Sequence, residues 1–293
     1  MNISKDVLNA FIQINRGMVK NAANAEQRAD ATMLLLDSWS DATKAAPFQT
    51  EAHKFVDESD ALIKYIIELK ARVLSASING NADGAGFEAF LENGHLIDIG
   101  DKEKVSKPDE NQNTTAMLIG SEPANPIETP WSAVELRKKL SAFSERAAAV
   151  EVTDVKGKVH KLAENSPETM NLIKSTFVFE DLSVPGEDQK EKWETALFYH
   201  TPVAAVISHL SKLENDVILV KNAVLNYLTS QINSSDLKFS DVTVAVVPKQ
   251  SYIMRGDSFV AEIYLAAYNK NSSTRVYMSS GEAGENAKPE LFD

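Results

Sequence analysis

The chain contains no cysteine among its 293 residues. Without thiols it can form no disulfide, no thiolate zinc site and no cysteine nucleophile, although this says little about compartment because many bacterial periplasmic proteins also lack cysteine. No apolar run approaches the ~20 residues that span a bilayer, and no signal-peptide pattern follows Met1. As given, the sequence therefore predicts neither a membrane anchor nor an export signal.

Basic residues are also scarce relative to acidic ones. Lys and Arg total 30 against 42 for Asp and Glu, which gives a net charge of -12. This charge repels phosphate backbones and anionic lipid headgroups, so no nucleic-acid partner is expected. The 43% apolar content excludes wholesale disorder, and 293 residues exceed the usual size of one hydrophobic core. We therefore expect two globular domains.

Motifs that carry catalysis or ligand binding are missing as well. Gly84 and Gly86 lack the third glycine of a dinucleotide fingerprint, and Phe90 stands where a calcium loop opened by Asn79, Asn81 and Asp83 would need a bidentate Glu. No two histidines have helical metal-ligand spacing; they are His53, His95, His160, His200 and His209. The sequence thus predicts no catalytic residue, no cofactor and no metal, and a protein that is not an enzyme.

Three other features have structural interpretations that we favour over functional ones. Arg255-Gly256-Asp257 spells a cell-adhesion tripeptide but lies between strand-like runs, where a tight turn is expected. The charged stretch Glu187 to Glu194 is either a docking surface or, as we prefer, a solvated helix face. The three tryptophans are expected in the core rather than in a pocket; they are Trp39, Trp131 and Trp193.

Apolar residues in the first part of the chain recur at helical spacing. They predict one helix from about Ser4 through Leu36, an end to that region at Pro47, and a second helix from about Thr50 to the Asn79-Gly80 C-cap. Residues 79–130 are rich in Gly and Pro and predict a long irregular loop region, with short strands around Leu96 to Ile99.

Regular structure returns after this region. A helix is expected to start at Thr129-Pro130 and to end near Val150, followed by a small hairpin around Gly157. Ser166-Pro167 begins a short helix, and a further helix is expected from about Asp188 to Tyr199.

The strongest helical pattern lies between Val203 and Ile232. A helix of this length is about 45 Å long, at about 1.5 Å per residue. It carries an apolar seam at alternating spacings of four and three, formed by Val206, Leu210, Leu213, Val217, Val220, Val224 and Tyr227. Part of this seam could lie between subunits, but we expect most of it to pack within the bundle of its own subunit.

Beyond Asn233 the period changes from helical to two. Strand-like runs include Leu237 to Val246, Ser251 to Met254, Phe259 to Tyr268 and Arg275 to Met278. They predict an immunoglobulin-like β-sandwich that is incomplete, because only four or five strands are visible. The expected organisation is a helical bundle domain over residues 1–235 and a partial sandwich domain over residues 236–293.

Several stretches resemble one known family. They are residues 2–11 (NISKDVLNAF), the run from His200-Thr201-Pro202 through Leu213, Asn215-Asp216-Val217, Asn226-Tyr227-Leu228, and Val247-Pro248-Lys249 through Tyr252, Gly256 and Ala261-Glu262. These segments are similar to the gliding-motility protein GldM, called PorM in non-gliding relatives. The resemblance implies a component of the type IX secretion system of Bacteroidetes.

The resemblance also implies a membrane helix and protein partners, none of which is part of the sequence given. In the family a single membrane helix precedes the segment matching residues 2–11 and anchors the protein in the inner membrane, and the rest is a periplasmic homodimeric shaft. Members pair with GldL as a proton-driven motor and reach the ring of GldK and GldN. The expectation for this chain is therefore a truncated periplasmic fragment that transmits force.

A different class of function also stays open. A periplasmic helical-bundle sensor would need an apolar pocket with converging polar groups, and residues 79–130 are its only plausible wall. An enzyme is the weaker alternative, because the spacing of residues nominates no acid and base pair and no nucleophile.

Overall fold

The protein consists of two compact units, residues 1–232 and 233–293, which we describe separately. The computed structural model describes residues 4–81, 83–101, 103–183, 190–234, 241–248, 261–268, 276–278 and 290–292. The helix-then-β order predicted from the sequence is confirmed.

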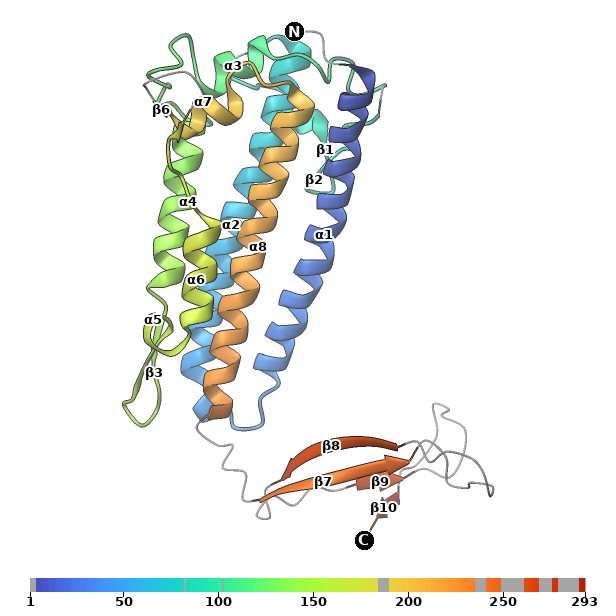
Figure 1. The fold of residues 1–293 in the computed structure, drawn as a ribbon, viewed down its shortest axis with the longest axis vertical. Helices are drawn as coiled ribbons and strands as arrows, with labels where there is room; N and C mark the ends of the chain where they lie inside the picture. The colour runs from blue at the N-terminus through green and yellow to red at the C-terminus, as the bar shows by residue number, and fades with distance from the viewer. Residues whose placement is uncertain are drawn as a thin grey trace. The chain divides into compact units, whose positions relative to one another are not determined.

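Long, roughly aligned helices form the first unit (Figure 1). These are α1 (Lys5–Asp37), α2 (Ala42–Asn79), α4 (Ala133–Ala148), α6 (Pro167–Thr176) and α8 (Val203–Ser234). In the view of Figure 1, α8 runs between α1 on one side and α4 and α6 on the other. The shorter helices are η1 (Phe87–Phe90), α3 (Gln112–Leu118), α5 (Leu162–Asn165) and α7 (Trp193–Phe198). One continuous apolar core joins the long helices.

Short antiparallel hairpins lie in the connections between the helices of the first unit. β1 (Leu91–Glu92) pairs with β2 (His95–Leu96), and β3 (Glu151–Thr153) pairs with β4 (Val159–Lys161). The second of these is the hairpin expected around Gly157, whose φ is +82°. β5 (Leu182–Ser183) pairs with β6 (Lys190–Glu191).

The second unit contains two antiparallel pairs among its described residues. β7 (Asp241–Pro248) pairs along its whole length with β8 (Ala261–Tyr268), and β9 (Val276–Met278) pairs with β10 (Glu290–Phe292), which the sequence did not predict. The described strands show two separate pairs rather than two packed sheets, so the predicted sandwich is not confirmed. The Arg255-Gly256-Asp257 tripeptide and the expected strand Ser251 to Met254 lie outside the described residues.

The predicted break at Pro47 is wrong. α2 already begins at Ala42, where the side chain of Asp41 caps it by accepting a hydrogen bond from the Lys44 amide at 3.2 Å. Pro47 lies inside the helix, where its missing N–H leaves one carbonyl without its usual donor. The neighbouring Phe48 is buried, as are Ala45 and Ala52 on the same face. Burial of this face outweighs the loss of one hydrogen bond.

Two other helix boundaries also differ from the prediction. α4 starts at Ala133 rather than Pro130, because Ser132 is the N-cap and its hydroxyl accepts from the Glu135 amide at 3.3 Å. The helix expected from Asp188 to Tyr199 is limited to α7, because Lys190 and Glu191 form strand β6, which pairs with β5. Within the region expected to be loop, α3 and η1 are helical.

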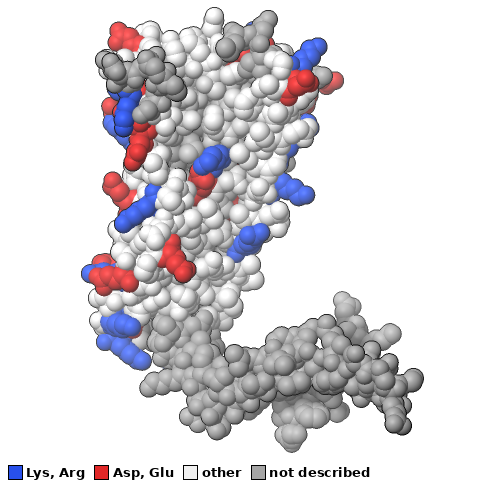
Figure 2. Space-filling view, viewed as in Figure 1, with Lys and Arg blue, Asp and Glu red and all other residues white. Residues whose placement is uncertain are grey.

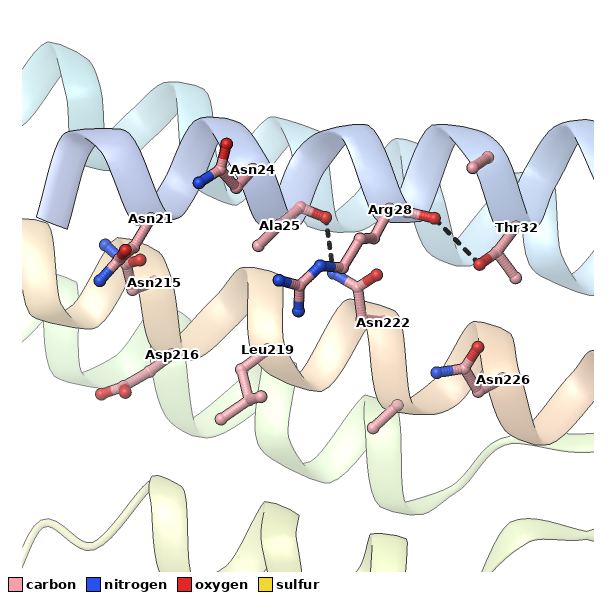
Figure 3. Close-up of a pocket in the computed structure, with 12 residues that line it drawn as sticks. Asn21, Asn24, Ala25, Arg28, Thr32, Asn215, Asp216, Leu219, Asn222 and Asn226 are labelled. Atoms are coloured by element: carbon pink, nitrogen blue, oxygen red, sulfur yellow. Dashed lines mark hydrogen bonds between the residues drawn. The ribbon is translucent and has the colours of Figure 1, made fainter. Parts of the chain in front are cut away.

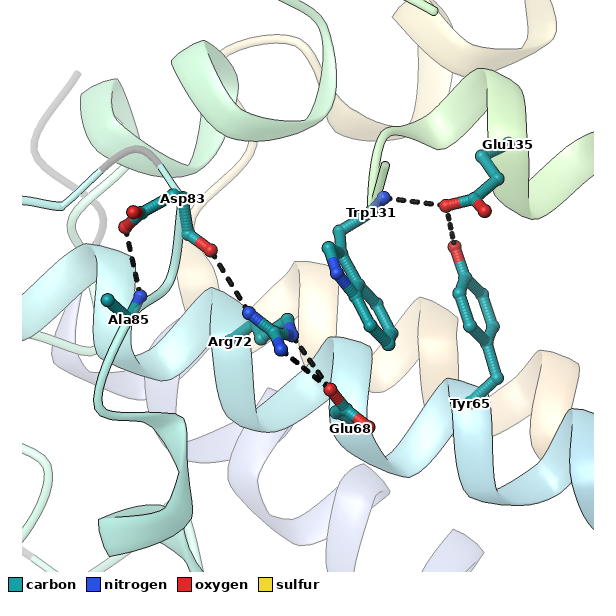
Figure 4. Close-up of polar contacts among 7 residues, drawn as sticks. All are labelled: Tyr65, Glu68, Arg72, Asp83, Ala85, Trp131 and Glu135. Carbon is teal, nitrogen blue, oxygen red and sulfur yellow. Dashed lines mark hydrogen bonds and ion pairs between the residues drawn. The ribbon is translucent and has the colours of Figure 1, made fainter. Parts of the chain in front are cut away.

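A stack of rings and cations fixes this irregular region against α2 and α4 (Figure 4). The guanidinium of Arg72 lies between the rings of Phe87 and Trp131, at 4.1 and 4.2 Å from their centroids. Trp131 in turn stacks on Tyr65 with centroids 4.8 Å apart. Glu135 accepts from both the Trp131 amide at 2.6 Å and the Tyr65 hydroxyl at 3.0 Å. These bonds hold Trp131 at a φ of +69°, which bulky residues rarely adopt.

The chain passes so close to α2 at Gly84 that a side chain would not fit. A Cβ on Gly84 would lie 2.6 Å from the Arg72 Cβ and 2.8 Å from its carbonyl oxygen, and φ there is +65°. Gly94 has a similar φ of +80° but open space around it. Substitutions at these two glycines therefore distinguish the cost of backbone strain, which both carry, from the cost of a steric clash, which only Gly84 carries.

We predict that Gly84→Ala destabilises the protein more than Gly94→Ala. Both substitutions carry the strain of a positive φ, about 1 to 3 kcal/mol, while Gly84→Ala also forces the loop away from Arg72. Denaturant unfolding of the two variants measures the difference. Equal losses of stability would show that the close approach to α2 is not maintained.

Candidate coupling interface between helices α1 and α8

The seven predicted seam residues all lie on α8 and all are buried within one chain. Their exposed fractions run from 0% to 7%; the residues are Val206, Leu210, Leu213, Val217, Val220, Val224 and Tyr227. The hydroxyl of Tyr227 accepts from the Asn165 side chain at 3.5 Å, and burial raises its pKa. The seam therefore forms part of the core of the single bundle.

A second row of α8 side chains, polar and spaced by seven, faces α1. Ser208, Asn215 and Asn222 donate to the backbone carbonyls of Phe11, Met18 and Ala25 at 3.2, 3.1 and 3.0 Å. Both helices advance by seven residues from each of these bonds to the next, and in the same direction. We call these three bonds the α1–α8 ladder, and they require the two helices to be parallel and in one register.

Each ladder side chain also bonds to its own helix. The same three groups donate to the carbonyls of Ala204, Ser211 and Ile218, four residues earlier on α8, at 2.8 to 2.9 Å. Each donor group is therefore shared between a carbonyl of α8 and one of α1. This anchoring restricts the side-chain rotamer, so little conformational entropy remains to be lost when the bond to α1 forms.

Small residues on α1 allow the close approach that the ladder needs. The buried positions of α1 are also spaced by seven, and they are Asn15, Ala22, Ala29 and Leu36. An alanine or asparagine keeps the α1 backbone near α8, where a larger side chain would push the carbonyls out of hydrogen-bonding range. Asn15 itself accepts a bond from the Ser211 hydroxyl at 2.7 Å.

Two buried lysines tie α2 into the same interface. Lys70 of α2 is 2% exposed and contacts Ser211 at 3.3 Å and the carboxylate of Glu214. Lys221 of α8, also 2% exposed, contacts Glu26 of α1 and lies 2.8 Å from Asp60 of α2. Burying an ammonium costs several kcal/mol unless it is paired, so these contacts disfavour any arrangement that separates the three helices.

The sequence contained a signal for the ladder that apolar periodicity did not reveal. Ser208, Asn215, Asn222 and Thr229 recur every seven residues on the face opposite the seam. Polar residues at such positions normally face solvent. Here Ser208 and Thr229 are buried and the two asparagines are half-buried, because α1 covers this face of α8.

The other residues singled out in the sequence have structural surroundings. His160 is buried between Asp154 and Gln231, and His53 lies 2.9 Å from Asp37. Trp193 is buried, and Trp39 and Trp131 pack partly buried against the core. Glu194 was expected on a solvated face and is instead buried, with its carboxylate 2.9 Å from Arg137. The reason is that α7 packs onto α4.

Two kinds of site are absent from the described part of the chain. There, no three or more His, Asp or Glu side chains are grouped so that they could hold a metal ion. The described helices also include none with the length and apolarity needed to cross a bilayer.

We predict that Leu213→Ala lowers the free energy of unfolding by about 2 to 5 kcal/mol, as expected when a large core side chain is truncated. Leu219, on the same helix, is 47% exposed, and Leu219→Ala should change stability by no more than about 0.5 kcal/mol. Denaturant unfolding measures the change in the free energy of unfolding for both variants. A Leu213→Ala protein that melts normally but changes its oligomeric state would place this part of the seam between subunits.

Comparison with known proteins agrees with the two-unit division. The family model for the GldM N-terminal domain matches residues 6–231, and the model for the GldM second domain matches residues 233–289. No curated protein matches the chain. The two matches together span most of the sequence, with the first covering the helical unit and the second the β unit. The chain therefore belongs to the GldM family of structural components of gliding motility and type IX secretion.

Proposed function

We propose that this protein is a non-enzymatic shaft component of the type IX secretion and gliding machinery. In this role it passes force from an inner-membrane, proton-driven complex toward the ring associated with the outer membrane. The observation that carries the proposal is the α1–α8 ladder, which joins the first helix of the chain to the helix that leads into the second unit.

Helices of this length are suited to carrying load. α1 has 33 residues and α8 has 32, so each is about 50 Å long at about 1.5 Å per residue. Without the ladder, force applied at the N-terminal end of α1 would reach α8 through apolar core contacts and along the chain through α2. The ladder and the two buried lysines provide a direct lateral connection at several levels.

The direction of the two helices suits transmission along the bundle. Because α1 and α8 are parallel, a pull or twist that enters at the start of α1 acts on α8 in the same sense. α8 extends to Ser234, and the second unit begins at Asn233. Among the described elements, β7 of the β unit comes next after the loaded helix.

The finer assignments rest on the family resemblance. They are a periplasmic location, an inner-membrane anchor that precedes the matched region, a homodimer, a GldL-like partner in the membrane and GldK-like and GldN-like ring proteins. The sensor alternative predicted a pocket against residues 79–130. No specific observation favours it, since this region packs on α2 through Phe87 and Gly84.

The proposal predicts that the double variant Asn215→Ala and Asn222→Ala impairs both protein secretion and surface movement in cells that carry it as their only copy. It removes two ladder bonds, at about 1 kcal/mol each. Ile173→Val, in the buried part of α6, should cost about 0.5 to 1.5 kcal/mol, close to the loss of one ladder bond, without touching the ladder.

The measurements are secreted protein, gliding speed and the cellular amount of each variant. Loss of activity in the ladder variant but not in Ile173→Val, at equal protein amounts, is the expected outcome. Normal secretion and movement in the ladder variant would remove the basis of the proposal.

A further inference from the structure

The bundle contains grooves of two chemical kinds. One, of about 810 Å³, lies between α1 and α8 and is lined by amides such as Asn21, Asn215 and Asn226 (Figure 3). Another, of about 340 Å³, lies between α2 and α4 and has a mainly apolar lining, and we call it the α2–α4 slot. Apolar pockets of about 300 to 1,000 Å³ with a few polar groups are typical of small-molecule sites. The α2–α4 slot therefore has the size and the lining of a site for a small ligand.

Small and large apolar side chains together shape the slot. Ala61 of α2 and Ala142 of α4 are exposed, and their short side chains leave the space between the helices open. Leu62 and Phe143 are 8% and 6% exposed and form the floor. Phe143 is held in place by stacking on Phe55, with ring centroids 5.6 Å apart. An apolar ligand therefore meets a floor that is already formed, so little order has to be created on binding.

At one end of the slot the charges are already paired. Arg146 donates from Nη2 to Glu51 at 2.6 Å, and its Nε atom lies 2.7 Å from the Oε2 atom of Glu58. Two carboxylates around one guanidinium leave this end with a net negative charge. It therefore repels a further anion.

At the other end a lysine can still accept an anion. The ammonium of Lys139 lies 3.6 Å from the Oε1 atom of Glu135, beyond hydrogen-bond distance, and 4.8 Å from the centroid of the Tyr65 ring. The Oε2 atom of Glu135 already accepts from the Tyr65 hydroxyl and the Trp131 amide (Figure 4). Burial raises the pKa of Tyr65, so this hydroxyl keeps its proton. A lysine ammonium has three donors, and those of Lys139 are available to a ligand.

Neighbouring basic side chains of α4 are paired more closely than Lys139. Along the edge of the bundle where α4 lies, basic and acidic side chains are next to one another (Figure 2). Lys138 contacts the carboxylate of Glu128, and the Nε atom of Arg137 lies 2.9 Å from Glu194. Lys139 thus combines an available ammonium with a position beside an apolar slot.

The length of the slot limits the length of its ligand. Lys139 and Arg146 line opposite ends and are seven residues apart on α4, which is about 10 Å at about 1.5 Å per residue. An extended alkyl chain lying between the two helices fits such a space, with its polar end at Lys139.

We propose that the α2–α4 slot binds a medium-chain carboxylate, whose head group contacts Lys139 and whose alkyl chain covers Leu62 and Phe143. The ammonium neutralises the head group. The apolar floor supplies most of the affinity, because a chain with a net charge of -12 does not attract anions at long range. This inference goes beyond the proposed function and does not depend on it. A ligand that contacts both α2 and α4 stabilises the folded bundle.

The dependence of affinity on chain length tests the slot directly. Burial of one methylene group raises affinity by up to about fourfold, so the Kd is expected to fall from butanoate to hexanoate to octanoate. Decanoate is expected to gain nothing further, because its chain exceeds the slot. Isothermal titration calorimetry with the full chain measures each Kd, and octanoate should bind at one molecule per chain.

Matched variants locate the head group. Lys139→Gln should weaken octanoate binding about tenfold and leave the binding of 1-octanol, a neutral probe of the same chain length, unchanged. Lys138→Gln is the control, because Lys138 is the adjacent exposed residue and does not line the slot. It should leave both affinities unchanged.

A third variant locates the alkyl chain. Ala142→Leu fills the slot and should abolish saturable octanoate binding. Ala142 is exposed on α4 and leucine is a good helix former, so the fold should be retained, which circular dichroism checks.

Four results would overturn the inference. They are no saturable binding below the concentration at which octanoate forms micelles, an affinity that keeps rising through decanoate, equal effects of Lys138→Gln and Lys139→Gln, or octanoate binding that survives Ala142→Leu. None of these results bears on the shaft role, which is measured separately by secretion and gliding of the ladder variant.

Discussion

The hydrogen bonds that asparagine and serine side chains of α8 donate to backbone carbonyls of α1 determine how this bundle is built. A side chain that bonds to a carbonyl on another helix requires the two backbones to be close, and three such bonds in one register require them to stay parallel over several turns. The alanines on α1, the buried lysines and the central position of α8 are consistent with this requirement. The apolar seam on the other side of α8 then packs against the rest of the bundle.

Polar contacts supplement apolar packing in holding α1. Its buried residues are one asparagine, two alanines and one leucine, while Leu8, Phe11, Ile12 and Met33 pack only partly buried against the core. Hydrogen bonds and paired charges depend strongly on distance and angle, and they specify register better than apolar contacts do. A helix attached in this way resists sliding along its neighbour, which is the property that a force-transmitting element needs.

Much of the fold could be predicted from the sequence because long helices leave a clear period. α8 and its seam, the end of α2 at Gly80, and the hairpin around Gly157 follow from spacing and glycine alone. The start of α2 could not be predicted, because burial of Phe48 outweighs the local preference of Pro47. The ladder was missed because Ser208, Asn215 and Asn222 are common on exposed faces. Their pairing with α1, almost 200 positions away in the chain, is a tertiary property.

A disulfide between α1 and α8 tests the central claim most directly. The Oδ1 atom of Asn15 lies 2.7 Å from the Oγ atom of Ser211, so these two side chains meet between the helices. Thiol titration checks that cysteines placed there form the disulfide on oxidation, since the chain has no other thiol. If α1 and α8 carry force as one unit, cells whose only copy is the oxidised Asn15→Cys and Ser211→Cys protein will secrete and glide normally. Loss of both activities on oxidation, with recovery on reduction, would show that α1 must move relative to α8 and would contradict this account.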